Sequence, residues 1–243
     1  MSSQRGFTLI ELAIVLVIVT ILIGGLSVPL SAQIQARRIA ETKKTLEEAR
    51  EAILGYAMTH AVDHDADPGT PPRPFLPCPD ANGDGIEEAR DAAGDCPQRA
   101  GWLPWVTLGT GSQDAWGNRL RYATHEDLTN SNNGFFDGSE AAPTSTWNHV
   151  CSLANCPTVD VAANVPVVVV SHGPNGWGAR NINGNTLALP TSANEIENLD
   201  ADHRYVSRIP SKPGDAAGEF DDLTVWLPFS VLINRVCPAG GCP

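Results

Sequence analysis

The chain has 243 residues, of which 16 are lysine or arginine and 28 are aspartate or glutamate, so its formal net charge at pH 7 is −12. An acidic chain without a stripe of basic residues lacks the phosphate-binding surface of nucleic-acid-binding proteins, and we expect no nucleic-acid partner. The length suits one sizeable domain together with an N-terminal extension.

The first predicted element is an apolar helix that follows a short polar leader. The run from Phe7 to Val28 has a single charged residue, Glu11. As a helix it would be roughly 33 Å long at about 1.5 Å per residue, enough to cross a bilayer. A carboxylate in such a segment costs roughly 2.5 to 3.5 kcal/mol on insertion scales, so we expect Glu11 to have a cationic partner.

The sequence around this junction, G-F-T-L-I-E at residues 6–11, resembles the processing site of the type IV pilin and type II secretion pseudopilin superfamily. The resemblance implies a leader of residues 1–6, cleavage after Gly6 by a prepilin peptidase, and N-methylation of Phe7. It also implies that Glu11 meets the N-terminal amine of a neighbouring subunit when helices pack side by side in a filament.

Two other interpretations of the N-terminus are available. An ordinary secretory signal would be cleaved near Ser27 or Ala32, but the apolar region of such a signal is about 7 to 15 residues long and carries no acid. A plain membrane anchor would explain the length of the apolar run, but not Glu11 or the Gly6–Phe7 pair that precedes it.

A second helical stretch follows Pro29, a residue that we expect to kink the helix or open it locally. Apolar side chains recur at helical spacing beyond it, which predicts that residues 30–60 form an amphipathic helix with one face on a globular domain. Together with the transmembrane and assembly segment of residues 7–28, this stretch resembles the long helical spine of pilins, residues 7–60.

The head, residues 61–243, is predicted to be a sheet domain with long loops. It begins with a stretch rich in Pro, Gly and Asp, residues 63–79, which indicates a linker. Three β-rich segments follow, at residues 119–124, 165–173 and 222–232. A helix followed by short strands predicts an α+β fold in which the N-terminal helix packs on an antiparallel sheet.

Two segments of the head extend the resemblance. Residues 114–122, DAWGNRLRY, look like the D-P-W-G-N-P-x-x-Y stretch of major type II pseudopilins, and VVVVSHGPNGWG is similar to their following strand and Gly-rich turn. Ala115 stands where that family favours proline, and the loop from Cys78 to Cys96 is inserted. The resemblance therefore points to the superfamily more strongly than to one class of filament.

Six cysteines lie beyond the apolar segment, and an even number there suggests disulfides formed outside the cytoplasm. They fall into three local pairs, which we favour as the disulfides: Cys78 with Cys96, Cys151 with Cys156, and Cys237 with Cys242. A zinc site is the alternative. It is disfavoured because the chain has no C-x-x-C and no histidine at ligand spacing from these cysteines.

The loop closed by the first pair contains D-x-N-x-D-G, a pattern typical of calcium-binding loops, in which Gly85 permits the sharp turn. Positions one, three, five, seven, nine and twelve are occupied by Asp80, Asn82, Asp84, Ile86 through its carbonyl, Glu88 and Asp91. This resembles an EF-hand or dockerin-type loop with Asp instead of Glu at the last position. An acidic turn without an ion is the alternative.

The resemblance to pseudopilins implies a second place for calcium, since that family binds the ion in its C-terminal loop region. The candidates there are Asp200, Asp202, Asp221 and Asp222. The sequence leaves open which of the two acidic clusters binds calcium.

The remaining features favour packing over catalysis. The chain has six tryptophans, and tryptophans in loop-rich sheet domains more often pack in the core than form ligand platforms. Ser171 and His172 end a β-rich segment, but neighbours on a strand point to opposite faces and no G-x-S-x-G surrounds them. We therefore expect no enzymatic activity.

The resemblance implies a structural subunit of a type IV pilus-like or type II secretion pseudopilus filament, polymerised with itself or with other pilins. Its other partners would be prepilin peptidase, the inner-membrane assembly platform and the membrane. The precursor would cross the bacterial inner membrane once with its head in the periplasm, and the filament would be periplasmic or extracellular. The alternative is a membrane-tethered calcium-binding or adhesin module that does not polymerise.

Overall fold

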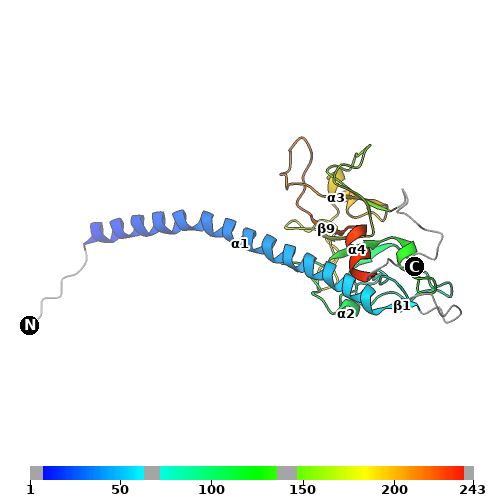
Figure 1. The fold of residues 1–243 in the computed structure, drawn as a ribbon. Helices are drawn as coiled ribbons and strands as arrows, with labels where there is room; N and C mark the ends of the chain where they lie inside the picture. Colours follow the sequence, from blue (N-terminus) through cyan, green and yellow to red (C-terminus); the bar gives the residue numbers. More distant parts are fainter. Residues whose placement is uncertain (1–7, 63–71, 136–146, 238–243) are drawn as a thin grey trace, which may run out of the picture. The chain divides into compact units, whose positions relative to one another are not determined.

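The computed structural model describes residues 8–62, 72–135 and 147–237, and for residues 24–29 it describes the backbone alone (Figure 1). The chain divides into two compact units, Met1–Ala40 and Glu41–Pro243. One helix, α1 (Leu9–Thr59), continues through Pro29 without interruption. It contains the predicted amphipathic stretch and ends one residue before the predicted boundary.

In the first unit, the described side chains of α1 from Leu9 to Ile23 are all exposed, and most of them are apolar. Phe7 and the side chains of residues 24–28, which belong to the predicted membrane segment, lie outside the description. The described part of the chain contains no helix whose length and apolar character would let it cross a membrane.

In the second unit, α1 contributes one face to the main hydrophobic core. The buried residues recur at helical spacing and are Leu46, Ala49, Ile53, Leu54 and Ala57. No residue from 30 to 41, all of them described, is buried. The amphipathic face therefore occupies the C-terminal part of the predicted 30–60 stretch and not its first turns.

The helix packs on a four-stranded antiparallel sheet with strand order β3-β4-β7-β9. The strands are β3 (Ala100–Trp102), β4 (Arg121–Thr124), β7 (Val167–Ser171) and β9 (Leu223–Leu227). Alternation along β7 places Val167 and Val169 in the core with α1, and Val168 and Val170 in a second core on the other face. Both faces of this sheet are covered, which is why β7 is apolar without interruption.

A three-stranded sheet shares the second core, with Val150 and Tyr205 among its buried residues. Its order is β6-β5-β8, formed by Ala162–Val165, Asn148–Cys151 and Arg204–Val206. The pair β5–β6 is antiparallel, but β5–β8 is parallel. The prediction of an α+β fold with a helix on an antiparallel sheet is confirmed, but a purely antiparallel head is wrong at β8.

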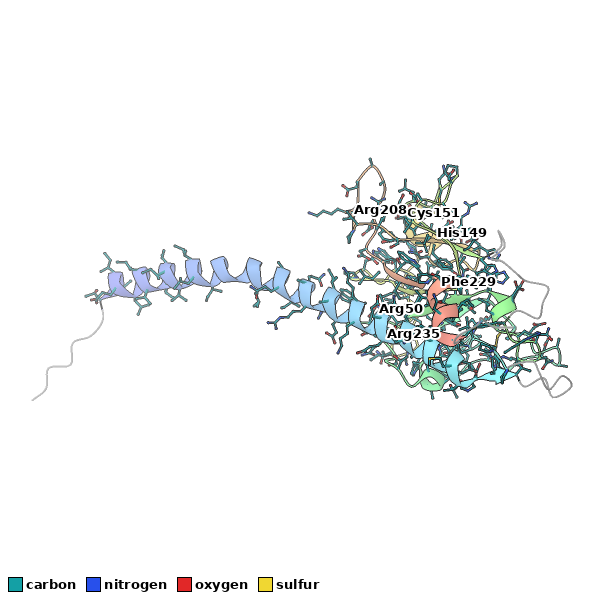
Figure 2. All side chains as sticks on the ribbon, viewed as in Figure 1. Arg50, His149, Cys151, Arg208, Phe229 and Arg235 are labelled. Atoms are coloured by element: carbon teal, nitrogen blue, oxygen red, sulfur yellow. A yellow bond between two sulfur atoms is a disulfide. The ribbon has the colours of Figure 1, made fainter. Side chains whose placement is uncertain are left out.

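Smaller elements complete the described chain. They are β1 (Ala61–Val62) paired with β2 (Arg73–Pro74), α2 (Trp105–Leu108), a 3₁₀ turn η1 (Glu126–Leu128), α3 (Ala193–Glu197) and α4 (Phe229–Val236). The predicted strand over 222–232 is wrong in its last third, because Pro228 ends β9 and starts α4. Arg235, which Figure 2 labels, lies on α4. Its Nη2 is 3.1 Å from Oε2 of Glu51 on α1, an ion pair between the two helices.

Two of the three favoured disulfides are present, Cys78–Cys96 and Cys151–Cys156. Cys242 lies outside the described residues, so its pairing with Cys237 stays a prediction. The expectation that the tryptophans pack in the core is correct for Trp147, which is buried, and for Trp226, which is half-buried and packs against the second core. The other four are half-buried and belong to neither core.

Candidate functional site

The first candidate site is the start of α1. Gly6 and Phe7 lie outside the described residues, so the cleavage junction stays a prediction. Oε2 of Glu11 accepts hydrogen bonds from the backbone N–H and the hydroxyl of Thr8, each at 2.8 Å, and the N–H of Glu11 donates to Oγ1 of Thr8 at 3.4 Å. This reciprocal arrangement is a capping box. No basic side chain among the described residues forms an ion pair with the exposed Glu11.

The second candidate site is the loop that begins at Asp80, a residue with no solvent exposure. Oδ1 of Asp80 accepts from the N–H groups of Asn82 (3.0 Å) and Gly83 (2.6 Å), and Oδ2 accepts from that of Gly85 (2.7 Å). Burial raises the pKa of Asp80, and these hydrogen bonds oppose the rise. Both carboxylate oxygens therefore bind the loop's own backbone.

The other predicted calcium ligands also accept backbone hydrogen bonds. Asn82 accepts from Asp84 and Asp84 from Ile86, both at 2.8 Å, which are successive Asx turns. Glu88 accepts from the N–H of Ala81 at 3.2 Å, whereas Asp91 accepts from the N–H groups of Ala93 (2.9 Å) and Asp95 (3.0 Å).

The described acidic side chains of this loop do not place three ligand atoms within 4.8 Å of one another. In addition, Nη1 of Arg180 donates to the carbonyl of Asn82, so a cation of the chain itself lies against the loop. Calcium binding by Asp80, Asn82, Asp84, Ile86, Glu88 and Asp91 stays a prediction.

Glu87, between two predicted ligands, has a role that sequence reasoning missed. Its carboxylate accepts from the hydroxyl of Tyr56 on α1 (2.8 Å), the N–H of Cys78 (3.1 Å) and the guanidinium of Arg90 (2.9 Å). This half-buried network fastens the inserted loop to the helix.

The third candidate site is a carboxylate cluster formed by Glu195 of α3 with Asp221 and Asp222, which precede β9. One oxygen of each lies within 4.8 Å of the others. Glu195 is 1% exposed and Asp222 is 3% exposed. Asp221 is half-buried. Carboxylates this close to one another repel unless a proton or a cation lies between them.

Hydrogen bonds leave two oxygens of this cluster unused. Oε1 of Glu195 accepts from the side chain of Asn175 (3.0 Å) and the N–H of Asp221 (3.2 Å), and Oδ2 of Asp221 accepts from the N–H of Asn175 (3.1 Å). Oε2 of Glu195 and Oδ1 of Asp221 are buried and have no hydrogen-bond partner in the described structure. Burial and the carboxylate of Glu195 raise the pKa of Asp221 to about 7.

Asp200 and Asp202, the other candidates of the C-terminal region, do not join this cluster. Oδ1 of Asp202 accepts from the N–H of Arg204 at 2.6 Å, at the start of β8. The sequence thus named two of the three clustered carboxylates. It missed Glu195, which lies in a five-residue helix without a motif.

Comparison with known proteins adds one finding. The family model of the prokaryotic N-terminal methylation motif matches residues 1–27. The chain carries the prepilin signature of type IV pilins and pseudopilins. No curated protein and no solved structure matches it.

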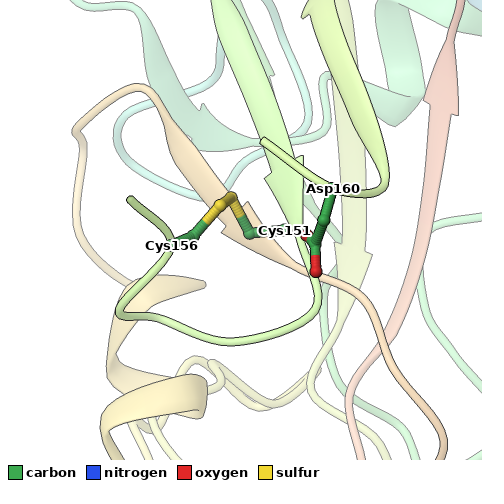
Figure 3. A group of neighbouring side chains, drawn as sticks. All are labelled: Cys151, Cys156 and Asp160. Atoms are coloured by element: carbon green, nitrogen blue, oxygen red, sulfur yellow. A yellow bond between two sulfur atoms is a disulfide. The ribbon is translucent and has the colours of Figure 1, made fainter. Parts of the chain in front are cut away.

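In the head of this chain, Cys151, Cys156 and Asp160 form another close group (Figure 3). The two sulfurs are joined in a disulfide, so they are not thiolate ligands for a metal. The hydroxyl and the N–H of Ser152 donate to Asp160 and lower its pKa. The group therefore closes the turn after β5.

Ser171 and His172 do not act on each other. The hydroxyl of Ser171 donates to Oδ2 of Asp114 at 2.7 Å, in the interior of the head. Nδ1 of His172, which is fully buried, lies 3.6 Å from Oδ1 of Asp222. Asp114 also accepts from the N–H groups of Trp116 and Asn118, so the DAWGN segment forms a turn fixed by its aspartate.

Proposed function

We propose that this prepilin is a structural subunit of a type IV pilus-like or type II secretion pseudopilus filament. The observation that carries the proposal is the N-terminal methylation motif at residues 1–27. The exposed apolar side chains of α1 from Leu9 to Ile23 support it, because packing against other such helices would bury them.

In this proposal, prepilin peptidase cuts after Gly6, and Phe7 becomes the methylated N-terminus. The precursor is anchored in the bacterial inner membrane with its head in the periplasm, and the assembly platform moves it into the filament. The carboxylate of Glu11 would then pair with the terminal amine of a neighbouring subunit. Other pilins are potential partners in a mixed filament.

The processing step is tested by intact-mass measurement of the protein from cell membranes. The expected mature chain begins at methylated Phe7, and Gly6→Leu should leave full-length precursor. A mature terminus near residue 28 or 33 would show an ordinary secretory signal and overturn the proposal.

The assembly step is tested by Glu11→Gln, with Glu41→Gln as the matched control on an exposed turn of the same helix. We expect Glu11→Gln to be processed normally but to reduce filament yield at equal subunit level, and the control to assemble. Normal filaments from Glu11→Gln would contradict the proposal that the charge of Glu11 is needed for assembly. A processed wild-type chain that never forms filaments would favour the tethered module.

We propose further that calcium binds at Glu195, Asp221 and Asp222. The unpartnered oxygens of Glu195 and Asp221 support this site, because calcium takes six to eight oxygen ligands and would neutralise the cluster. The ion would stabilise the head by mass action.

Calorimetric titration of the full chain in mild detergent with calcium chloride distinguishes the two acidic sites. We expect Glu195→Gln to abolish most of the binding heat, and the double variant Asp80→Ala, Asp84→Ala to retain it. The reverse result would place calcium in the 80–91 loop. An absence of binding to wild type at millimolar calcium would exclude both sites.

A further inference from the structure

We propose that Arg99 and His203 form an acid-sensitive contact that fastens the three-stranded sheet to the four-stranded sheet. The contact would hold at neutral pH and open under mild acid. This proposal is independent of filament assembly.

Arg99 lies where the two sheets meet. Its backbone carbonyl, just before β3, accepts a hydrogen bond from the N–H of Thr124 on β4 at 2.9 Å. Its side chain reaches the other sheet, where Nη2 donates to Oδ1 of Asn148 on β5 at 2.7 Å and Nη1 contacts Nε2 of His203 just before β8. The carbonyl of His203 in turn accepts from the N–H of His149 at 2.7 Å. One guanidinium therefore joins β3 to both β5 and β8.

The chemistry of the two groups fixes the protonation state of His203. A guanidinium carries only N–H donors, so Nε2 of His203 accepts through its lone pair and the imidazole is neutral, with its proton on Nδ1. Nδ1 of His203 is buried and has no hydrogen-bond partner in the described structure. Protonation of Nε2 would replace the lone pair with an N–H that faces the guanidinium, which breaks the hydrogen bond and places two cations side by side.

Some of the charged groups around His203 lower its pKa and others raise it. The ring of His125, from the segment after β4, lies 6.0 Å from that of His203, and its Nδ1 is 2.9 Å from Oδ2 of Asp127. Burial lowers the pKa of His203, and Arg99 and His125 lower it further. Asp202 and Glu126 oppose this, without reversing it.

Burial also lowers the pKa of His125 and of Arg99, and the negative charges of Tyr205, Glu126 and Asp202 oppose this effect at Arg99. Protonation of His203 or His125 in acid thus adds positive charge beside the guanidinium of Arg99, in a half-buried cluster.

The direction of the pH effect follows from the lowered pKa. When the sheets separate, His203 recovers its ordinary pKa of about 6.5, so the open form binds a proton that the closed form does not. The contact is therefore fully formed above about pH 6.5 and weakens as the pH falls below that value. For one imidazole, the open fraction rises by at most roughly tenfold between pH 7.5 and pH 5.5.

Hydrogen exchange of the full chain in mild detergent, corrected for the intrinsic pH dependence of exchange, tests the proposal. At pH 5.5 relative to pH 7.5, we expect amides of β5 and β8 to lose up to about tenfold in protection, and those of β7 and β9 to lose none. His203→Gln keeps an acceptor for Arg99 but does not titrate, so it should remove this loss. His60→Gln, at an exposed histidine in the segment after α1, is the matched control and should keep it.

Equal pH dependence in wild type and His203→Gln would overturn the proposal, as would uniform loss of protection across both sheets. If His203→Gln does not fold, the imidazole resonances of wild type decide the question. An apparent pKa of His203 at or above about 6.5 would exclude the contact as an acid-sensitive one.

Discussion

Asp80 illustrates at the residue scale how burial decides the role of a carboxylate. It accepts three backbone hydrogen bonds with no solvent exposure, whereas Asp84, four residues later, is exposed and accepts one. We expect Asp80→Ala to lower the free energy of unfolding by about 3 kcal/mol, since it leaves the buried N–H of Gly85 and the part-buried N–H groups of Asn82 and Gly83 without their acceptor. Asp84→Ala should cost less than about 1 kcal/mol.

Chemical denaturation of both variants in calcium-free buffer measures the difference between them. Equal decreases in the free energy of unfolding would show that the hydrogen bonds to Asp80 do not stabilise the loop.

Asp221 makes the stability of the calcium-free chain depend on pH. Its pKa rises to about 7 on folding, from an ordinary value near 3.9 in the unfolded chain. An acid whose folded pKa is raised favours folding below its unfolded pKa, and this contribution is lost as the pH rises through the folded value. With chelator present, we expect the melting temperature to fall between about pH 4 and pH 7 through this group.

Asp221→Asn should make the melting temperature depend less steeply on pH in this range, and melting curves at several pH values would measure the change. Asp84→Asn, at an exposed carboxylate outside the cluster, is the control. An unchanged slope in Asp221→Asn would assign the pH dependence to other groups.

At the scale of elements, the C-terminal turns of α1 are joined to the sheet mainly by apolar contacts. Ile53 is fully buried in the core that also contains Val167 and Val169 of β7. We expect Ile53→Ala to cost about 3 kcal/mol of unfolding free energy, through lost burial and the cavity that remains.

Glu48→Ala, at a side chain 53% exposed on the same helix, should cost less than about 0.5 kcal/mol despite its ion pair with Lys44. Urea denaturation distinguishes the two variants. A small effect of Ile53→Ala would mean that the helix contributes little to the stability of the head.

Sequence predicts the elements whose pattern is local and strong. The apolar run of β7 and the helical spacing of apolar residues in the C-terminal part of α1 were predictable. In both elements, the pattern of apolar residues along the segment itself indicates which side chains are buried. Strands β5 and β8 were missed because four and three residues are too few for a period, and they include polar residues such as Asn148 and Arg204. The candidate sites follow the same rule: Glu11 stands in a contiguous motif, whereas Glu195 and Arg99 reach their partners only through the fold.

At the scale of the whole molecule, every residue of the main core comes from the second unit, Glu41–Pro243. A fragment of residues 31–243 therefore keeps all the buried contacts of the head and should fold without the N-terminal segment. We expect one cooperative thermal transition with the same midpoint as the full chain, measured by circular dichroism under oxidising conditions. A broad, non-cooperative transition would show that the head needs the first unit.

The capping box at the start of α1 has a consequence for maturation. Thr8 and Glu11 both lie on the mature side of the proposed cleavage junction, so removal of the leader leaves the cap intact. Cleavage would instead create an ammonium group beside the positive end of the helix dipole, an unfavourable arrangement. Glu11 is the anionic group nearest to that new charge in the sequence, so its carboxylate would compensate for maturation within its own chain before any neighbouring subunit arrives.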